Sequence, residues 1–181
     1  YPLLKAHANK YGPISLIQFD SHSDTWAEQT KRFDHGSMFY HASKEGIINS
    51  KNSVQIGLRT NNKDTHGFNI LDANFVHDHN VKETCDKIKK IVGTNNCYLS
   101  FDIDFLDPAY APGTGTPVCG GFTTWEAQSL IRGLNGINFI GGDLVEVSPS
   151  YDKGEITALA AASILLDFIC LLKSENILPK K

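Results

Sequence analysis

The sequence predicts an α/β protein with a mostly parallel sheet. Short apolar runs rich in β-branched and aromatic residues alternate with longer segments of helical periodicity, which is the pattern of βαβ units. The 181 residues, 41% of them hydrophobic, suffice for one domain with a substantial core, and we expect a single domain over residues 1–181. This composition excludes disordered, collagen-like and coiled-coil proteins.

Four short runs are the strand candidates. They cover residues 14–19, 53–58, 96–101 and 137–140. Each is apolar almost without interruption, which favours burial on both faces of a sheet over a half-exposed strand.

Three helices are expected between and after these strands. Apolar residues recur at helical spacing from Val81 to Val92, and Gly93 is a typical stop. Residues 123–126 have the spacing of a capping box, and Trp125 belongs to the apolar stripe of the helix that follows. The helix beginning near Glu155 is apolar around most of its circumference, so we expect it to be central.

Charge and cysteine content exclude several partners. The chain has 17 basic and 20 acidic residues without a block of one sign, so neither nucleic acid nor a membrane surface is indicated. The apolar run at 156–172 is shorter than the roughly 20 residues of a membrane span. Four scattered cysteines are expected to be reduced core thiols, as in a cytoplasmic protein: Cys85, Cys97, Cys119 and Cys170.

The first chemical signal follows the first strand. Asp20, His22 and Asp24 alternate directly after an apolar run, where ligands of open α/β sheets bind. In an extended chain all three would project to one side and supply carboxylate and imidazole ligands. An Asx-rich turn without a metal explains the same three residues, so both readings stay open here.

The second signal repeats this arrangement after another strand. Burying Asp102 and Asp104 without a partner would cost several kcal/mol each, on the order expected for unpaired ions, unless a cation were present. Two cations would offset four carboxylates in one site. Carboxylate and imidazole ligands without a nearby cysteine favour Mn²⁺ or a similar ion over structural zinc, so we predict a two-metal hydrolase.

Three stretches closely resemble the arginase and agmatinase family of ureohydrolases: residues 19–25, 100–117 and 142–147. They occur in the family's order, and residues 33–39 and 154–161 are more similar to agmatinases than to arginases. The resemblance implies the three-layer α/β/α arginase fold and a pair of Mn²⁺ ions. It also implies hydrolysis of the guanidinium group of agmatine, which yields putrescine and urea.

The resemblance assigns metal ligands by motif position. Asp20 and Asp102 would bridge both ions, and Asp24 would bind one of them. His22 and Asp104 would complete much of the shell of the other ion. Together they would lower the pKa of a bridging water until hydroxide forms near neutral pH, and Asp104 would accept a hydrogen bond from that hydroxide.

Two further residues are catalytic candidates by the same resemblance. Glu146 matches the carboxylate that pairs with the substrate guanidinium, the alternative being a surface glutamate. His35 matches the histidine of a mobile loop and is a candidate proton shuttle to the departing amine, the alternative being a solvated side chain. Residues 114–117 are expected to shape the pocket floor, with Gly113 and Gly115 permitting close backbone approach. Asp143 is expected to support a ligand histidine or cap a loop.

One part of the family pattern has no counterpart. Ureohydrolases carry a Gly-Gly-Asp-His segment upstream of the first motif, and its histidine completes a metal site, but no such segment precedes Asp20. We therefore expect an N-terminally incomplete fold, the C-terminal portion of an agmatinase-like protein. The family resemblance implies a homo-oligomer, a trimer or hexamer.

Two alternatives to an agmatinase stay open. One is a ureohydrolase acting on another guanidino compound such as guanidinobutyrate, which the charge at the far end of the pocket would decide. The other is a non-catalytic fragment that lacks one metal ligand.

Overall fold

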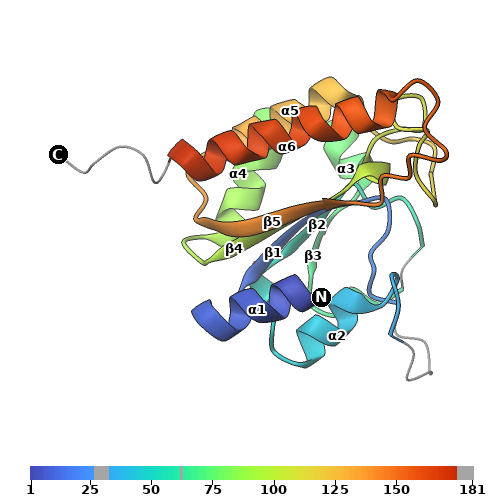
Figure 1. Ribbon diagram of the computed structural model, residues 1–181. Coiled ribbons are helices and arrows are strands. Elements are labelled where there is room, and N and C mark those ends of the chain that lie inside the picture. Colours follow the sequence, from blue (N-terminus) through green and yellow to red (C-terminus); the bar gives the residue numbers. More distant parts are fainter. Residues whose placement is uncertain (27–32, 62, 175–181) are drawn as a thin grey trace.

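The computed structural model describes residues 1–26, 33–61 and 63–174. Its centre is a five-stranded parallel sheet in the order β3-β2-β1-β4-β5. The strands are β1 (Ser15–Phe19), β2 (Val54–Ile56), β3 (Asn69–Leu71), β4 (Cys97–Asp102) and β5 (Phe139–Val145). Helices cover both faces of this sheet (Figure 1), which confirms the predicted three-layer α/β/α fold.

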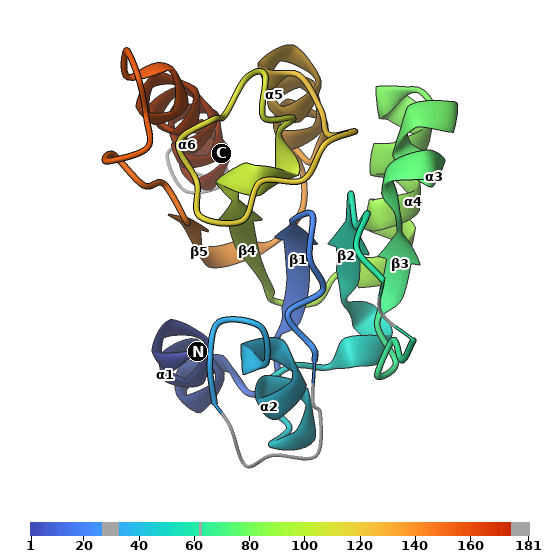
Figure 2. The same ribbon diagram turned by 90° about the vertical axis from the view of Figure 1, so that its right-hand side faces the viewer.

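The two helical layers differ in size. One face of the sheet carries α1 (Pro2–Tyr11) and α2 (Met38–Lys44), and Figure 2 shows these two helices on the opposite side from the others. The other face carries α3 (Ala73–Asp78), α4 (Val81–Val92), α5 (Thr124–Gly133) and α6 (Ile156–Ser174). The chain also forms short 3₁₀ turns at η1 (Ser50–Asn52) and η2 (Ile103–Phe105). None of the helices in the described part of the chain is both long and apolar enough to cross a membrane.

Side chains that alternate along the central strands build two cores. On β1, Ile17 and Phe19 pack in the core beneath α4, α5 and α6, whereas Leu16 packs in the core beneath α1 and α2. On β4, Leu99 and Tyr98 divide in the same way. β1 and β4 are buried along their whole length, as the nearly uninterrupted apolar runs predict.

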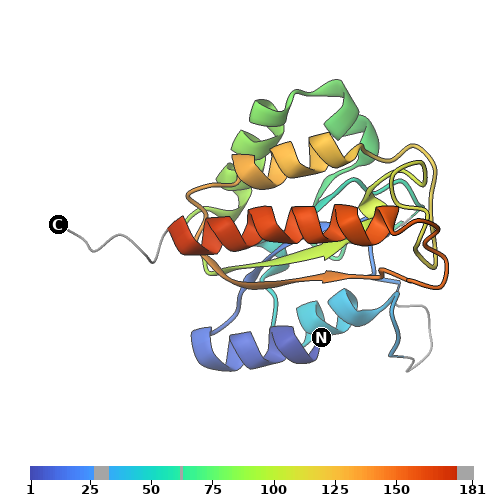
Figure 3. The same ribbon diagram turned by 45° about the horizontal axis from the view of Figure 1, so that its top comes forward.

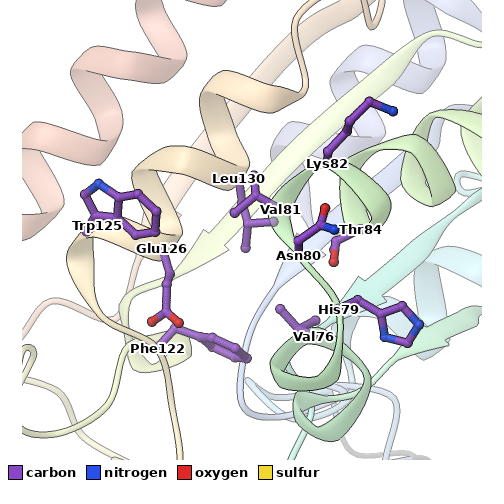
Figure 4. Close-up of a pocket in the computed structure, with 10 residues that line it drawn as sticks. All are labelled: Val76, His79, Asn80, Val81, Lys82, Thr84, Phe122, Trp125, Glu126 and Leu130. Carbon is purple, nitrogen blue, oxygen red and sulfur yellow. The ribbon is translucent and has the colours of Figure 1, made fainter.

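Capping boxes start two of the predicted helices. Asn80 and Glu83 exchange hydrogen bonds at the start of α4, and Thr123 and Glu126 do so at the start of α5. A cavity of about 400 Å³ lies between these two helix starts, with Val81 and Leu130 among its apolar walls (Figure 4).

The prediction that Trp125 belongs to the buried stripe of α5 is wrong. Its residue surface is 68% exposed, whereas Leu130 and Ile131 are buried. Trp125 precedes Leu130 by five positions, which places it about 140° away around the helix.

The expectation that α6 is central is also wrong. α6 lies beside α5 over β5 (Figure 3), and its inner side buries Ile164 and Phe168. Ile156, Leu159 and Leu166 are 51%, 70% and 61% exposed on its outer side. In the described chain no layer lies beyond α6, so an apolar circumference does not make this helix an interior one.

Other departures concern short elements and thiols. β5 begins at Phe139 and runs to Val145, beyond the predicted 137–140, and β3 with α1, α2 and α3 was not predicted. All four cysteines are free, but Cys119 and Cys170 are exposed, so the expectation of core thiols holds only for the other two.

Candidate active site

Two acidic loops meet at the carboxyl edge of the sheet. β1 and β4 pair in parallel with Phe19 opposite Phe101, so the loops that follow them begin at the same edge. One ligand atom from each of Asp20, His22 and Asp104 lies within 4.8 Å of the others. The structure thus brings both predicted clusters into one site.

Hydrogen bonds join the two loops directly. The Ser21 amide and hydroxyl donate to Oδ1 of Asp104 at 3.0 and 2.8 Å. Nδ1 of His22 lies 2.9 Å from Oδ2 of Asp104. Within the second loop, the Asp104 amide donates to Oδ1 of Asp102 at 2.8 Å. The relative position of the carboxylates is therefore fixed by protein contacts alone.

Two buried glutamines support the first loop, and our sequence analysis did not identify them. Nε2 of Gln18 donates to Oδ2 of Asp20 at 2.7 Å. Nε2 of Gln55 donates to Oε1 of Gln18 and to the Ser23 carbonyl oxygen, each at 2.5 Å. The available signal was a glutamine inside each of two otherwise apolar strands, a residue type that is rarely buried without a polar partner.

The pKa values at the site show how costly its negative charge is. Burial raises the pKa of Asp20 to about 6. A hydrogen bond from His22 opposes this shift, and the charge of Asp104 adds to it. Burial, followed by the charge of Asp20, raises the pKa of Asp102 to about 10. Burial also raises the pKa of Asp24. A nearby cation would favour the charged form of all three carboxylates.

The imidazole is the one cationic group inside this cluster. Burial disfavours the charged form of His22, but hydrogen bonds to Asp104 and Asp20 outweigh burial and raise its pKa to about 10. Burial likewise acts to raise the pKa of Asp104, but hydrogen bonds led by that from His22 lower it overall. Without a metal ion, the positive charge of protonated His22 therefore offsets part of the negative charge of these carboxylates.

The donor set suits a divalent metal ion. Asp20, His22 and Asp104 offer carboxylate oxygen and imidazole nitrogen in a buried position, and these three residues form a possible metal site.

A cavity of about 690 Å³ opens beside this cluster. Its lining includes three candidate metal ligands, His22, Asp24 and Asp102, together with Glu146 and His35. Nδ1 of His35 lies 3.0 Å from Oε1 of Glu146. The two side chains are 91% and 36% exposed, so the structure places both catalytic candidates at the open part of one cavity.

Two cavity residues adopt left-handed backbone conformations. Asp24 has φ 52° and Glu146 has φ 63°. Such values are uncommon outside glycine and cost on the order of 1–3 kcal/mol when the surroundings impose them. Both carboxylates are therefore aimed by a constrained backbone as well as by their side chains.

The loop over residues 113–117 meets expectation in part. Thr116 lines the cavity, and its hydroxyl donates to Oδ2 of Asp104 at 3.4 Å. A Cβ at Gly113 would lie 2.9 Å from the Asp152 backbone, whereas one at Gly115 would meet nothing within 4 Å. The expected close backbone approach thus occurs at Gly113 and not at Gly115.

Asp143 has other partners than a ligand histidine in the described chain. It accepts hydrogen bonds from the Tyr98 hydroxyl at 2.9 Å and from the Ser100 hydroxyl at 2.8 Å. These contacts tie β5 to β4 within the sheet.

Known proteins share both this fold and these motifs. The model of the arginase family matches residues 1–170. The chain is 53% identical to an agmatinase of Chromobacterium violaceum over 98% of its length and 56% of that protein. It is 55% identical to an agmatinase of Proteus mirabilis over 94% of its length and 55% of that protein.

Solved structures give the same result. A structure described as a hypothetical agmatinase from Burkholderia thailandensis superposes with a TM-score of 0.94 at 55% identity, over 97% of this chain and 56% of that one. The proclavaminate amidino hydrolase of Streptomyces clavuligerus superposes with a TM-score of 0.89 at 38% identity, over 93% and 59%. The chain spans somewhat more than half the length of these relatives. With the family model matching most of its residues, this chain belongs to the arginase family.

Proposed function

We propose that the protein hydrolyses agmatine to putrescine and urea at a site holding two Mn²⁺ ions. The observation that carries this proposal is the shared cavity, whose lining includes His22, Asp24 and Asp102 together with Glu146 and His35. The names of the relatives above, agmatinases at 53% and 55% identity, support the choice of substrate.

The charge of the cavity supports a dicationic substrate. Apart from the proposed metal ligands Asp24 and Asp102, the described residues that line it include two carboxylates, Asp34 and Glu146, and neither lysine nor arginine. Agmatine carries a guanidinium at one end and an ammonium at the other, and both complement this lining. Guanidinobutyrate carries a carboxylate tail, which these side chains would repel.

Each cavity residue has a role that follows from its position. Glu146 accepts hydrogen bonds from the substrate guanidinium and orients its planar carbon toward the metal cluster. His35, within hydrogen-bond distance of Glu146, is placed to give a proton to the nitrogen that leaves as the amine. Ser21 and Gln18 hold the carboxylates of the cluster in place before substrate arrives.

The ligands proposed for the metal ions are Asp20, His22, Asp24, Asp102 and Asp104. Bound there, the ions would lower the pKa of coordinated water so that hydroxide is available near neutral pH. The protein also determines where the substrate binds. The guanidinium carbon would lie between the buried ligand cluster and the more exposed carboxylate of Glu146.

Urea release tests the proposal. The purified protein, stripped of metal and resupplied with Mn²⁺, is incubated in parallel with agmatine and with guanidinobutyrate, and urea and the amine product are measured. We expect urea and putrescine in equal amounts from agmatine and little from guanidinobutyrate.

Two results would contradict the proposal in different ways. Hydrolysis of another guanidino compound without hydrolysis of agmatine would defeat the substrate assignment. Failure with every guanidino compound, together with less than one metal ion per chain, would favour the non-catalytic alternative.

A further inference from the structure

Arg59 lies behind the candidate metal cluster, in the turn that follows β2. Its half-buried guanidinium donates six hydrogen bonds to main-chain carbonyl oxygens of the described chain. The shortest runs from Nη2 to the Asp104 carbonyl oxygen at 2.6 Å, and Nη2 and Nε reach the Val118 carbonyl oxygen at 2.8 and 3.1 Å. Further bonds reach Phe105, Leu106 and Gly57.

The backbone of the same turn holds the other ligand loop. The amides of Arg59 and Thr60 donate to the Ser21 carbonyl oxygen at 3.1 and 3.3 Å, and the Thr60 hydroxyl donates to it at 3.0 Å. Ser21 stands between Asp20 and His22 in the chain. One turn therefore binds the first ligand loop through its backbone and the second through the Arg59 side chain.

The surroundings of Arg59 leave space for a guanidinium. A Cβ at Gly121 would lie 2.6 Å from Nη2 of Arg59 and 2.5 Å from the Asp107 amide nitrogen. Asp107 in turn accepts hydrogen bonds from the amides of Gly120 and Gly121 at 2.9 and 3.0 Å. The loop after β4 is thus folded back around the guanidinium and fixed there.

We propose that Arg59 is a positioning residue that sets the distance between the two ligand loops and thereby the affinity of the site for divalent metal. The proposal rests on the metal cluster of the proposed function. An arginine is required because its planar group has five N–H donors in a fixed arrangement, whereas a lysine has three donors on one nitrogen. Arg59 touches neither substrate nor metal, so its effect passes through the loops.

The test compares Arg59→Lys with the matched control Arg132→Lys. Arg132 is 59% exposed and pairs with Asp167 between α5 and α6. Mn²⁺ affinity is measured by competition with a chelator. We expect Arg59→Lys to weaken Mn²⁺ binding about 10- to 100-fold, as changes behind metal ligands do, and the control to bind as the wild type does.

Hydrogen exchange of the metal-free protein gives a second measurement. The Asp104 amide donates within the second loop, whereas the Ser21 amide donates across to that loop, so they report on the second loop and on the link between the loops. We expect both to exchange faster in Arg59→Lys and neither in the control. Gly121→Ala, which crowds the guanidinium but keeps the arginine, is expected to change affinity and exchange in the same direction.

Several results would overturn the proposal. Unchanged affinity with faster exchange would leave Arg59 a purely structural residue, and unchanged exchange would remove the link between the loops. If the wild type itself bound no metal, the proposed function would fail, and the exchange measurement alone would decide whether Arg59 joins the loops. If Arg59→Lys did not fold, Gly121→Ala would decide in its place.

Discussion

β4 and β5 are neighbouring strands, and each leads to a carboxylate at the same edge of the sheet. The two carboxylates differ in how deeply they are buried. Every residue of β4 is buried, and its Asp102 lies opposite Val145 of β5. β5 is only half-buried along its length, and the side chain of the following Glu146 is 36% exposed. Burial raises the pKa of Asp102 to about 10, whereas Glu146 meets its partner His35 at the open cavity.

The comparison separates two tasks of one residue type. A carboxylate in the interior needs a cation for its charge, which suits a permanent ligand such as a metal ion. A carboxylate at the rim keeps its charge in contact with water, which suits a substrate that must enter and leave. The four predictions below test this separation, from the largest expected effect to the smallest.

Replacing Asp102 by Asn is expected to remove metal and activity together. The loss should exceed the roughly 10- to 100-fold effect of a change behind the ligands, because Asp102 is proposed to bridge both ions. Metal per chain and urea release measure it. Asp86→Asn, at an exposed site on α4, is the control. A variant that keeps both metal and activity would exclude the bridging role.

His35→Ala is expected to lower kcat about 100-fold at unchanged metal content, the low end for loss of a positioned proton donor. KM should fall at the same time, since the guanidinium then no longer displaces an imidazole from Glu146. Steady-state kinetics with agmatine provide both numbers. An unchanged kcat would return His35 to the status of a solvated side chain.

Glu146→Gln should lower kcat/KM about 20-fold, because a charge-assisted hydrogen bond becomes a neutral one at a partly exposed site. The metal content is expected to stay at the wild-type level. Loss of metal in this variant would instead place Glu146 among the ligands and abolish the contrast between β4 and β5.

The metal-free protein is expected to lose stability as the pH rises from about 7 to about 9. Folded Asp102 and His22, each with a pKa of about 10, keep protons that an unfolded chain with pKa values of 3.8 and 6.5 has released. Each such proton lowers the free energy of unfolding by about 1.4 kcal/mol per pH unit. Bound metal should oppose this slope.

Thermal unfolding at several pH values, with chelator and with Mn²⁺, measures the effect. Asp102→Asn should show a smaller slope without metal, since the amide does not titrate. A Tm that rises with pH over this range in the metal-free wild type would contradict the raised pKa values of Asp102 and His22.

The sequence predicted the elements that repeat a strong local pattern. Nearly continuous apolar runs located β1, β2 and β4, and helical apolar spacing located α4. The capping residues of α5 stand where their spacing indicated. β3 has only three residues and α1 buries only Leu4, so neither has a periodic signal to detect. An apolar circumference does not indicate whether another layer covers the outer side of a helix, so the exposure of α6 depended on what packs over it.

In the candidate site, too, residues with a local sequence pattern were predicted and residues without one were missed. Residues with characteristic chemistry at fixed spacing were predicted as site residues. The structure groups Asp20 with His22 and brings His22 and Glu146 to one cavity. Gln55 and Arg59 were missed because their hydrogen bonds reach residues that are distant in the sequence. Arg59 contacts the loops that follow β1 and β4, and no local pattern in its own turn indicates these contacts.

The pairing of Phe19 with Phe101 has a consequence for folding. Asp20 and Asp104 approach each other only after β1 and β4 align, and most of the intervening chain, with β2, β3 and α4, must form the loop between them. Closing such a long loop is entropically costly and makes long-range parallel pairing slow. We therefore expect the ligand set to assemble late, so that metal ions would capture a sheet that has already formed and would not nucleate it.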